Sequence, residues 1–332
     1  MGAIRNLISN LPKLTFAAAL IGILATLSVA QAQAQAWPQR PVKFVLPFGA
    51  GSATDIAARL IGERLSTKWG KPVIIENRPG GDGLIAIGAF VSANDDHVLL
   101  YASSATFIAH PYTQEKLPYD LNRDLAPIAR VSDTILAVSV PAETSIKTIA
   151  DFVKAARAAP DKNNAAGAPG LPEFAVMAFM KSENLGISKI PYKDVVQAGR
   201  DLAESRIQFL LSSLAVVQPL VEAGKIRVVA VGGRQRTPLV PGAPTVVEAG
   251  YPGLQMETTS GFYGPKGMPL ELRQRIGAEV VEAASDPTIA QRISSSGQAM
   301  QPGGPEELAR ALKQQAEHAA NIAKVLGMAA KN

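Results

Sequence analysis

The chain has 332 residues, of which 47% are hydrophobic and 18% charged, and its formal net charge at pH 7 is +5. This length suits two domains, and the composition excludes a disordered chain. The sequence contains no cysteine, which excludes a disulfide framework, thiolate metal sites, a cysteine nucleophile and a cysteine-linked lipid anchor.

The first 36 residues are typical of a secretory signal peptide. Arg5 and Lys13 precede an uncharged apolar run at 14–30, and small-x-small cleavage sites follow, such as Ala34-Gln35-Ala36. The alternative is an uncleaved membrane anchor, but the run is at the short end of the roughly 20 apolar residues that span a bilayer. We therefore expect cleavage and a periplasmic mature protein, whose net charge falls from +5 to +3 with the loss of two basic residues.

Strands and helices are predicted to alternate along the mature chain. A strand at 42–46 precedes a Gly-rich loop and a helix that contains Ile56, Leu60 and Leu65 and ends at Gly70. Further strands are expected at 72–75, 98–101, 135–140, 207–211 and 226–231, and helices from about Leu84, around 149–156 and over 305–326. This alternation predicts an α/β fold with mostly parallel sheets that helices cover on both faces.

Two extended stretches are candidates for connections between lobes, namely 128–140 and 255–264. If the chain leaves one lobe at the first stretch and returns at the second, that lobe is discontinuous. We expect lobe one to comprise 37–136 and 260–332, and lobe two to comprise 137–259.

Four junctions between a strand and a helix consist mainly of small residues. Small side chains let the backbone approach a ligand closely, and a helix N-terminus offers unpaired N–H groups to a carboxylate or phosphate. The alternative for any single junction is a purely structural role, in which its residues cap the helix N-terminus without binding a ligand. The candidate ligand-binding residues in these junctions are Phe48, Gly49, Ala50, Gly51, Ser52, Thr54, Asp55, Ser103, Ser104, Thr106, Ala168, Pro169, Gly170, Glu173, Ser212 and Ser213.

Other chemistry finds little support. No nucleophile elbow and no zinc-protease motif occurs, and the partial dinucleotide motif at Gly49 and Gly51 lacks its third glycine. Export from the cytoplasm also argues against a nucleotide cofactor, so no cofactor and no catalytic residue are expected. The 5% aromatic content and the scattered basic residues argue against a nucleic-acid partner. Asp95, Asp96 and His97 are interpreted as a solvated turn whose side chains point apart, and no metal site is expected. His110 follows the third strand and is a further candidate ligand contact.

The order and spacing of many motifs over 37–332 resemble the Bug proteins, the TctC-type substrate-binding proteins of tripartite tricarboxylate transporters. The resemblance implies two lobes joined by crossing strands, a carboxylate held between the loops 48–55, 103–106, 167–173 and 212–213, and closure of the lobes on it. It also implies delivery to a membrane permease, no chemical reaction, and a monomer. The motifs are Trp37-Pro38, Arg40-Pro41-Val42, Pro47-Phe48, Glu76-Asn77-Arg78-Pro79-Gly80-Gly81, Lys116-Leu117-Pro118-Tyr119-Asp120, Pro191-Tyr192-Lys193, Ala223-Gly224-Lys225-Ile226-Arg227, Val240-Pro241, Pro244-Thr245-Val246, Glu248-Ala249-Gly250 and Tyr263-Gly264-Pro265-Lys266-Gly267.

Several positions depart from the pattern that the resemblance leads us to expect. His110 stands where the family commonly has Asn, Leu211 where an acidic residue is common, and Glu173 where a His is usual. Leu171 and Pro172 suggest a more apolar or aromatic carboxylate, and Glu173, if it faces the ligand, would repel a second carboxylate or accept a hydrogen bond.

Two other functions remain open on the sequence alone. A ligand sensor that signals to a membrane histidine kinase would use the same binding chemistry. A periplasmic enzyme acting on small carboxylates would need a general base, for which Asp55 and Glu173 are the available candidates.

Overall fold

The computed structural model describes residues 37–192 and 194–331, so the expected signal peptide at 1–36 lies outside the described residues. All the helices and strands below belong to one compact unit, Val42–Asn332. Residues 37–41 contain neither helix nor strand. Within the described ranges, no helix combines the length and apolar character needed to cross a bilayer.

The first sheet has six strands. β1 pairs in parallel with β2 and β3, whereas β10 is antiparallel to β3 and β4, and β11 is antiparallel to β4. β1 to β4 therefore run in one direction, and β10 and β11 in the other. In spatial order the strands are β11 (Gln298–Gly303), β4 (Ala126–Thr134), β10 (Thr258–Gly264), β3 (Val98–Ser103), β1 (Val42–Leu46) and β2 (Val73–Asn77).

The second sheet has five strands, and β5 alone of these runs against the others, since it is antiparallel to both of its neighbours. The expected α/β fold with mostly parallel sheets is confirmed in strand direction, although both sheets are mixed. The spatial order is β7 (Ser188–Lys189), β6 (Asn164–Gly167), β8 (Phe209–Ser213), β5 (Leu136–Pro141) and β9 (Ile226–Val231).

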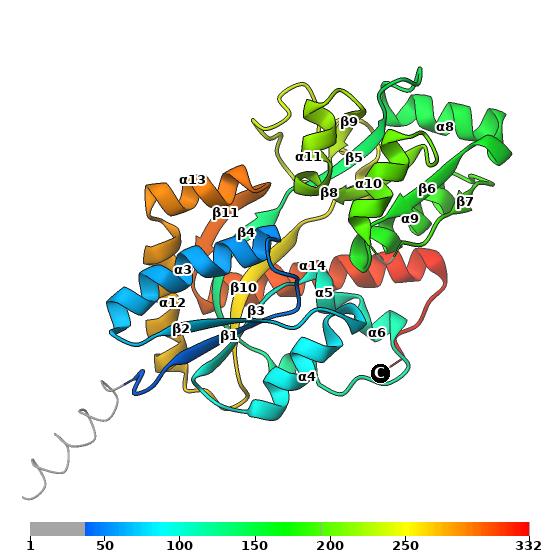
Figure 1. The fold of residues 1–332 in the computed structure, drawn as a ribbon. Coiled ribbons are helices and arrows are strands. Elements are labelled where there is room, and N and C mark those ends of the chain that lie inside the picture. The colour runs from blue at the N-terminus through cyan, green and yellow to red at the C-terminus, as the bar shows by residue number, and fades with distance from the viewer. Residues whose placement is uncertain (1–36, 193, 332) are drawn as a thin grey trace, which may run out of the picture. The chain divides into compact units, whose positions relative to one another are not determined.

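The chain passes from the first sheet to the second between Thr134, which ends β4, and Leu136, which begins β5 (Figure 1). It returns between Val231 and Thr258. Each lobe of this two-lobed fold is thus built on one sheet, and we call the segments at Thr134–Leu136 and Gln255–Glu257 the crossing segments. The exact lobe boundaries expected from the sequence remain a prediction.

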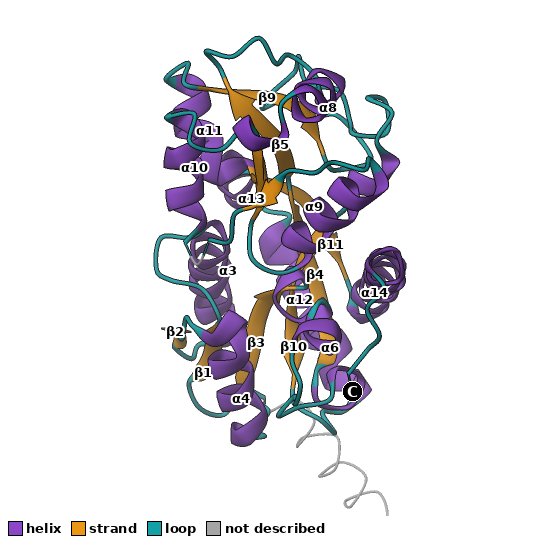
Figure 2. Ribbon diagram, turned by 90° about the vertical axis from the view of Figure 1, so that its right-hand side faces the viewer, coloured by secondary structure: helices purple, strands orange, loops and turns teal. Residues whose placement is uncertain are grey.

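Helices pack on both faces of the first sheet. α3 contacts β1, β2 and β3, α12 contacts β4, and α14 contacts β4, β10 and also α9 of the second lobe (Figure 2). The helices are α3 (Ala53–Trp69), α4 (Leu84–Ala93), α5 (Ala105–Ile108), α6 (His110–Thr113), α7 (Leu121–Asp124), α8 (Ile149–Ala158), α9 (Leu171–Ser182), α10 (Val195–Ala203), α11 (Leu214–Glu222), α12 (Leu270–Ala284), α13 (Pro287–Ser295) and α14 (Pro305–Leu326), with 3-10 turns η1 (Gly81–Gly83), η2 (Pro160–Lys162) and η3 (Pro252–Leu254).

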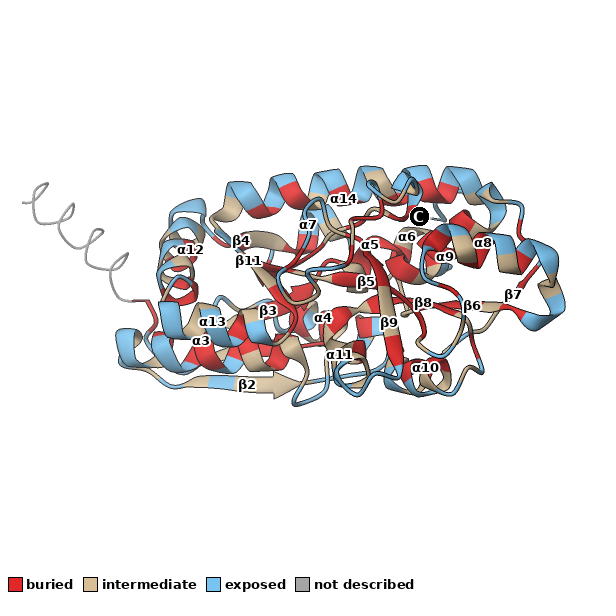
Figure 3. Ribbon diagram, turned by 90° about the horizontal axis from the view of Figure 1, so that it is seen from above, coloured by how far each residue is buried: buried red, intermediate tan, exposed pale blue. Residues whose placement is uncertain are grey.

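Strand alternation explains the two covered faces. Tyr101 of β3 stacks on Phe262 of β10 with ring centroids 4.4 Å apart. The adjacent residue in each strand, Leu100 in β3 and Tyr263 in β10, belongs to the core on the other face of the sheet. α14 buries one stripe of residues that are small or apolar except for Gln315, and it exposes the opposite face to solvent (Figure 3). This stripe explains why the helix is predictable from the sequence over its whole length.

The aromatic centre of the second lobe provides a test of the fold. Phe209 of β8 is completely buried, stacks on Phe179 at 5.3 Å and lies 4.8 Å from Phe152. Phe209→Ala is expected to lower the free energy of unfolding by about 3–5 kcal/mol, because the substitution removes buried area and leaves a cavity. Urea unfolding monitored by circular dichroism measures this loss. The control is Ile74→Ala at a side chain that is 49% exposed; equal losses in the two variants would contradict the assignment of this core.

Candidate functional site

The four predicted junctions follow strands that are neighbours in their sheets. β1 and β3 are parallel neighbours in the first sheet, and β6 and β8 are parallel neighbours in the second. The carboxyl ends of parallel neighbours lie at the same edge of a sheet, which is where ligands bind in open α/β folds. The Ala168 N–H also donates to the Leu211 carbonyl at 2.9 Å, so the two junctions of the second lobe are tied together.

Junctions of different lobes meet at Gly170. Its φ is +89°, and a Cβ placed on it would lie 2.8 Å from the Ala105 carbonyl oxygen, so only glycine fits this approach. Tyr112 of α6 and Phe174 of α9 add a ring contact at 6.5 Å between the same parts of the chain. The loops 103–106 and 167–173 therefore touch in this structure.

The loop after β1 is shaped by Asp55, which is 2% exposed. Its carboxylate accepts hydrogen bonds from the Gly51 N–H at 2.9 Å, from Arg59 Nε at 3.0 Å and from Asn77 Nδ2 at 2.9 Å. Burial opposes ionisation of Asp55, but the hydrogen bonds from Arg59, Gly51 and Asn77 outweigh it and lower its pKa. Asn77 Nδ2 also donates to the Phe48 carbonyl at 3.0 Å. Asp55 thus holds the loop in shape and has its oxygens occupied within the protein.

Other parts of this loop border open space. A Cβ on Gly49 or Gly51 would meet no atom within 4 Å, and Ala50 between them is exposed. Ser52 is the N-cap of α3 and accepts from the Asp55 N–H at 3.2 Å, while Thr54 is buried in the first helical turn. The backbone of 49–51 is therefore the accessible part of the junction.

In the second lobe, hydroxyl groups remain weakly engaged. Ser213 precedes α11 but makes no capping hydrogen bond, and Ser212 Oγ reaches the Ser213 carbonyl only at 3.4 Å. Ala168 and Pro169 are half-buried. In the first lobe, the hydroxyl of Ser103 accepts from the Ala105 N–H at a similarly long 3.4 Å. All three serines retain hydrogen-bonding capacity, but Ser212 is completely buried and Ser103 is 6% exposed, so Ser213 is the accessible one of the three.

Two further candidates of the first lobe are in contact with other parts of the protein. Ser104 is completely buried, and its hydroxyl accepts from the Thr259 N–H at 2.9 Å and donates to Gln315. Thr106 faces Gly83 so closely that its Cγ2 would lie 2.1 Å from a Cβ there. Ser104 and Thr106 therefore fix the position of the loop after β3 through contacts within the protein.

The expectation that His110 contacts a ligand is not supported, since the residue is 2% exposed and both ring nitrogens are bonded inside the protein. Nε2 lies 3.0 Å from the Asp82 carbonyl, which only accepts, so Nε2 carries the proton. Nδ1 then accepts from the Tyr119 hydroxyl at 2.6 Å. His110 therefore serves as a neutral core residue.

Glu173 is paired with Lys189 of β7, a partner that the sequence did not suggest. The two side chains are 28% and 27% exposed. The pairing offsets the negative charge that we expected to repel a second carboxylate. Leu171 and Pro172 are buried, so they do not support the expected preference for an apolar or aromatic ligand.

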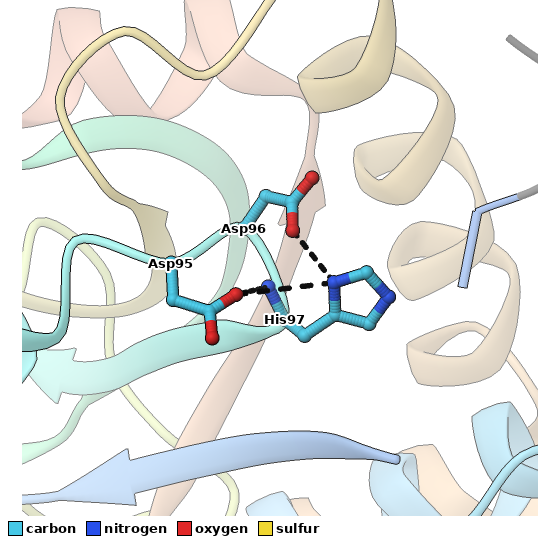
Figure 4. A group of neighbouring side chains, drawn as sticks. All are labelled: Asp95, Asp96 and His97. Carbon is cyan, nitrogen blue, oxygen red and sulfur yellow. Dashed lines mark hydrogen bonds and ion pairs between the residues drawn. The ribbon is translucent and has the colours of Figure 1, made fainter. Parts of the chain in front are cut away.

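Asp95, Asp96 and His97 form a turn before β3, as expected, but their side chains converge (Figure 4). The expectation that they point apart is wrong, because the potential ligand atoms lie within 4.8 Å of one another. His97 is also buried rather than solvated. Asp95 accepts from the His97 N–H at 2.9 Å, and Asp96 is hydrogen-bonded with the His97 ring at 2.6 Å. These bonds explain the cluster as a turn motif.

A separate cavity of about 740 Å³ lies at the crossing segments and beside α14. Leu171 is its one lining residue from the four junctions. Its charged lining residues include the pairs Arg130–Asp133 and Arg234–Glu257. We call it the crossing-segment cavity.

Comparison with known proteins identifies the family. The model of the tripartite tricarboxylate transporter family receptor, TctC, matches residues 57–328. The chain belongs to this receptor family. Members of the family are periplasmic solute-binding receptors, and the chain is accordingly not an enzyme.

Individual relatives agree with this assignment. A UPF0065 protein of Bordetella bronchiseptica is 33% identical over 297 residues, which cover 89% of this chain and 88% of the relative. The solved structure of Rpa4515 from Rhodopseudomonas palustris, determined with adipate, has a TM-score of 0.79 and 28% identity, covering 88% of this chain and 99% of that one. The periplasmic binding protein BugD, at 24% identity and a TM-score of 0.74, shares the fold.

The buried histidine at position 110 predicts a pH dependence of stability. Burial lowers the pKa of His110, with the Asp82 carbonyl opposing the shift. The unfolded chain, with a histidine pKa of about 6.5, then binds the proton more tightly. The contribution of neutral His110 to the free energy of unfolding is therefore fully present above about pH 6.5, the ordinary histidine pKa. It is lost as the pH falls through the lowered pKa of His110 in the folded protein.

We therefore expect His110→Asn to show a smaller fall of the urea midpoint between pH 7 and about 5 than the parent chain. Burial also lowers the pKa of His318, so His318→Gln should reduce the fall independently. A His110→Asn variant whose pH slope equals that of the parent would contradict this account of the buried ring.

Proposed function

We propose that the chain is an extracytoplasmic receptor that captures a small organic carboxylate among the four junction loops and delivers it to a tripartite tricarboxylate-type membrane permease. The observation that carries the proposal is the meeting of the two lobes at Gly170 and Ala105, next to a loop whose glycines border open space. A ligand held there would contact both lobes at once. The ligand would then stabilise the arrangement in which the two lobes meet.

The charges around the junctions suit an anion. The carboxylate of Asp55 is neutralised by Arg59, and that of Glu173 is paired with Lys189. The N-terminus of α3 and the N-terminus of α11 follow junctions that supply backbone N–H groups and the positive ends of helix dipoles. A carboxylate can thus be bound mainly by backbone N–H groups and serine hydroxyls, without an arginine clamp.

The relative solved with adipate supports a carboxylate as the ligand class. Adipate is a dicarboxylate with an apolar spacer, and such a ligand would place one carboxylate on each lobe. Candidate contacts are the backbone of Gly49–Gly51 and the hydroxyl of Ser213. The hydroxyls of Ser103 and Ser212 are buried in this structure and would contact a ligand only after a local rearrangement. We further propose export by the signal peptide and function as a monomer.

A thermal-shift screen of residues 37–332 against carboxylates, sugars, amino acids and nucleotides tests the function. A ligand that binds only the folded state stabilises it by about 2.7 kcal/mol at a hundredfold excess over Kd. We expect an upward shift with one class of carboxylates, confirmed by calorimetry and by mass spectrometry of material released on denaturation. Shifts with sugars or nucleotides alone would contradict the proposal.

A bulky side chain at Gly49 should block the site without disturbing the fold. Gly49→Val places a branched side chain in open space at a backbone conformation without positive φ. We expect it to raise the Kd of the best carboxylate at least about tenfold, which corresponds to about 1.4 kcal/mol of binding free energy.

Gly242→Val is the matched control, since Gly242 is also an exposed glycine on which a Cβ would meet no atom within 4 Å, and it lies outside the four junctions. Calorimetry measures the Kd of each variant, and equal melting temperatures of the two variants show that neither substitution disturbs the fold. Equal affinities in Gly49→Val and the control would exclude this loop from the binding site.

A further inference from the structure

A chain of buried hydrogen bonds joins the loop after β3 to β4 and β10, which we call the crossing strands because each adjoins a crossing segment. Ser104 Oγ donates to Gln315 Oε1 of α14, and Gln315 Nε2 donates to Thr259 Oγ1 at 2.8 Å. Thr259 Oγ1 in turn donates to Asp133 Oδ1 at 2.7 Å. The exposed fractions are 0% for Ser104 and Thr259, 7% for Asp133 and 8% for Gln315. We call these four residues the buried relay.

The direction of every bond in the buried relay is determined by its two ends. The Asp133 carboxylate, paired with Arg130, only accepts, so the Thr259 hydroxyl must donate to it and accept from Gln315. At the other end, the Ser104 hydroxyl accepts from the Thr259 N–H and therefore donates to Gln315. Position 315 consequently needs one donor and one acceptor in a fixed order, which an amide supplies.

The buried relay lies between the two features on which ligand capture would depend. Asp133 and Thr259 are partners in the register of β4 and β10, and Asp133 precedes Thr134, the last residue before the chain changes sheets. Ser104 precedes Ala105, whose carbonyl faces Gly170 of the other lobe. A displacement at Gln315 would therefore move the loop that meets the second lobe relative to the crossing strands.

We propose that Gln315 is a positioning residue for ligand binding, which holds the Ser103–Thr106 loop at the crossing strands in the orientation that the second lobe meets. This role rests on the proposed function. Gln315 touches no ligand, and its effect is transmitted through the Ser104 hydroxyl. It adds to the site a residue 211 positions away in the sequence.

The crossing-segment cavity makes the role testable in a folded protein. Asp133 and Gln315 both line it, so water from the cavity can reach the polar groups that lose their partner when Gln315 is replaced. Gln314 lines the same cavity, but it is exposed and outside the buried relay. Gln314→Leu is therefore a matched control for Gln315→Leu.

The first experiment compares Gln315→Leu, Gln314→Leu and Ser104→Ala in the mature chain. Calorimetry with adipate, or with the carboxylate that gives the largest thermal shift, measures Kd, and hydrogen exchange measures amide protection of residues 103–109. We expect Gln315→Leu to raise Kd about tenfold and to speed exchange in that segment, with less than about a twofold change for Gln314→Leu. The double variant Ser104→Ala/Gln315→Leu should bind no more weakly than the weaker single variant, because both break the same relay.

The second experiment uses Gln315→Glu, which preserves shape. A carboxylate at this position cannot donate to Thr259, whereas the protonated acid donates one hydrogen bond and accepts another, as the amide does. The ratio of its Kd to that of the parent chain should fall as the pH is lowered from 7.5 to about 5, while the ratio for Gln315→Leu stays constant. Taking ratios cancels the titration of groups common to both proteins, among them Arg130 and Asp133 on β4, Glu317 and His318 on α14, and Arg234, Arg236 and Glu257 across the cavity.

The outcomes separate the two proposals. If the parent chain binds none of the carboxylates, the proposed function fails and this role fails with it. If the parent chain binds and Gln315→Leu binds equally well, or if its loss matches that of Gln314→Leu, Gln315 supports the fold alone and the positioning role is overturned. A Gln315→Glu ratio that does not change with pH would overturn it too.

Discussion

The antiparallel pairing of β4 with β10 is the constraint on which the other features depend. These neighbouring strands place Asp133 opposite Thr259 just before the chain leaves for the second sheet. Because β10 also pairs with β3, the same register places Ser260 opposite Ser103. The end of β3, the start of the crossing and the inner face of α14 are thereby brought to one place, where the buried relay forms.

The two lobes use similar means to present backbone to a ligand, but they stabilise it differently. In the first lobe, hydrogen bonds among Asp55, Arg59 and Asn77 stabilise the glycine-containing loop after β1. In the second, close packing has this role, since a Cβ on Gly167 would lie 2.5 Å from the Glu173 Cα. Substitution is therefore limited by lost hydrogen bonds in the first loop and by steric overlap in the second.

Local patterns predicted most of the fold but only part of the site. The strand at 42–46, the helix from Leu84 and the helix over 305–326 agree with the structure, because hydrophobic periodicity and glycine stops are local signals. The short strands β6 and β11 lack such a pattern. The four junctions were found for the same local reason. The partners of Asp55, Glu173 and Ser104 were not, since Asn77, Lys189 and Gln315 are separated from them by 22, 16 and 211 positions and no spacing rule connects them.

The strands of the first sheet come from distant parts of the chain, which affects the order in which the two sheets can form during synthesis. Its strands β1, β2 and β3 come first in the chain, but β10, which pairs with β3, begins only at Thr258, after the whole second lobe. During synthesis from the N-terminus, the second sheet has all its strands available by Val231. The strand β3 therefore gains its antiparallel neighbour only when the last quarter of the chain has begun to emerge, so the first sheet is completed after the second.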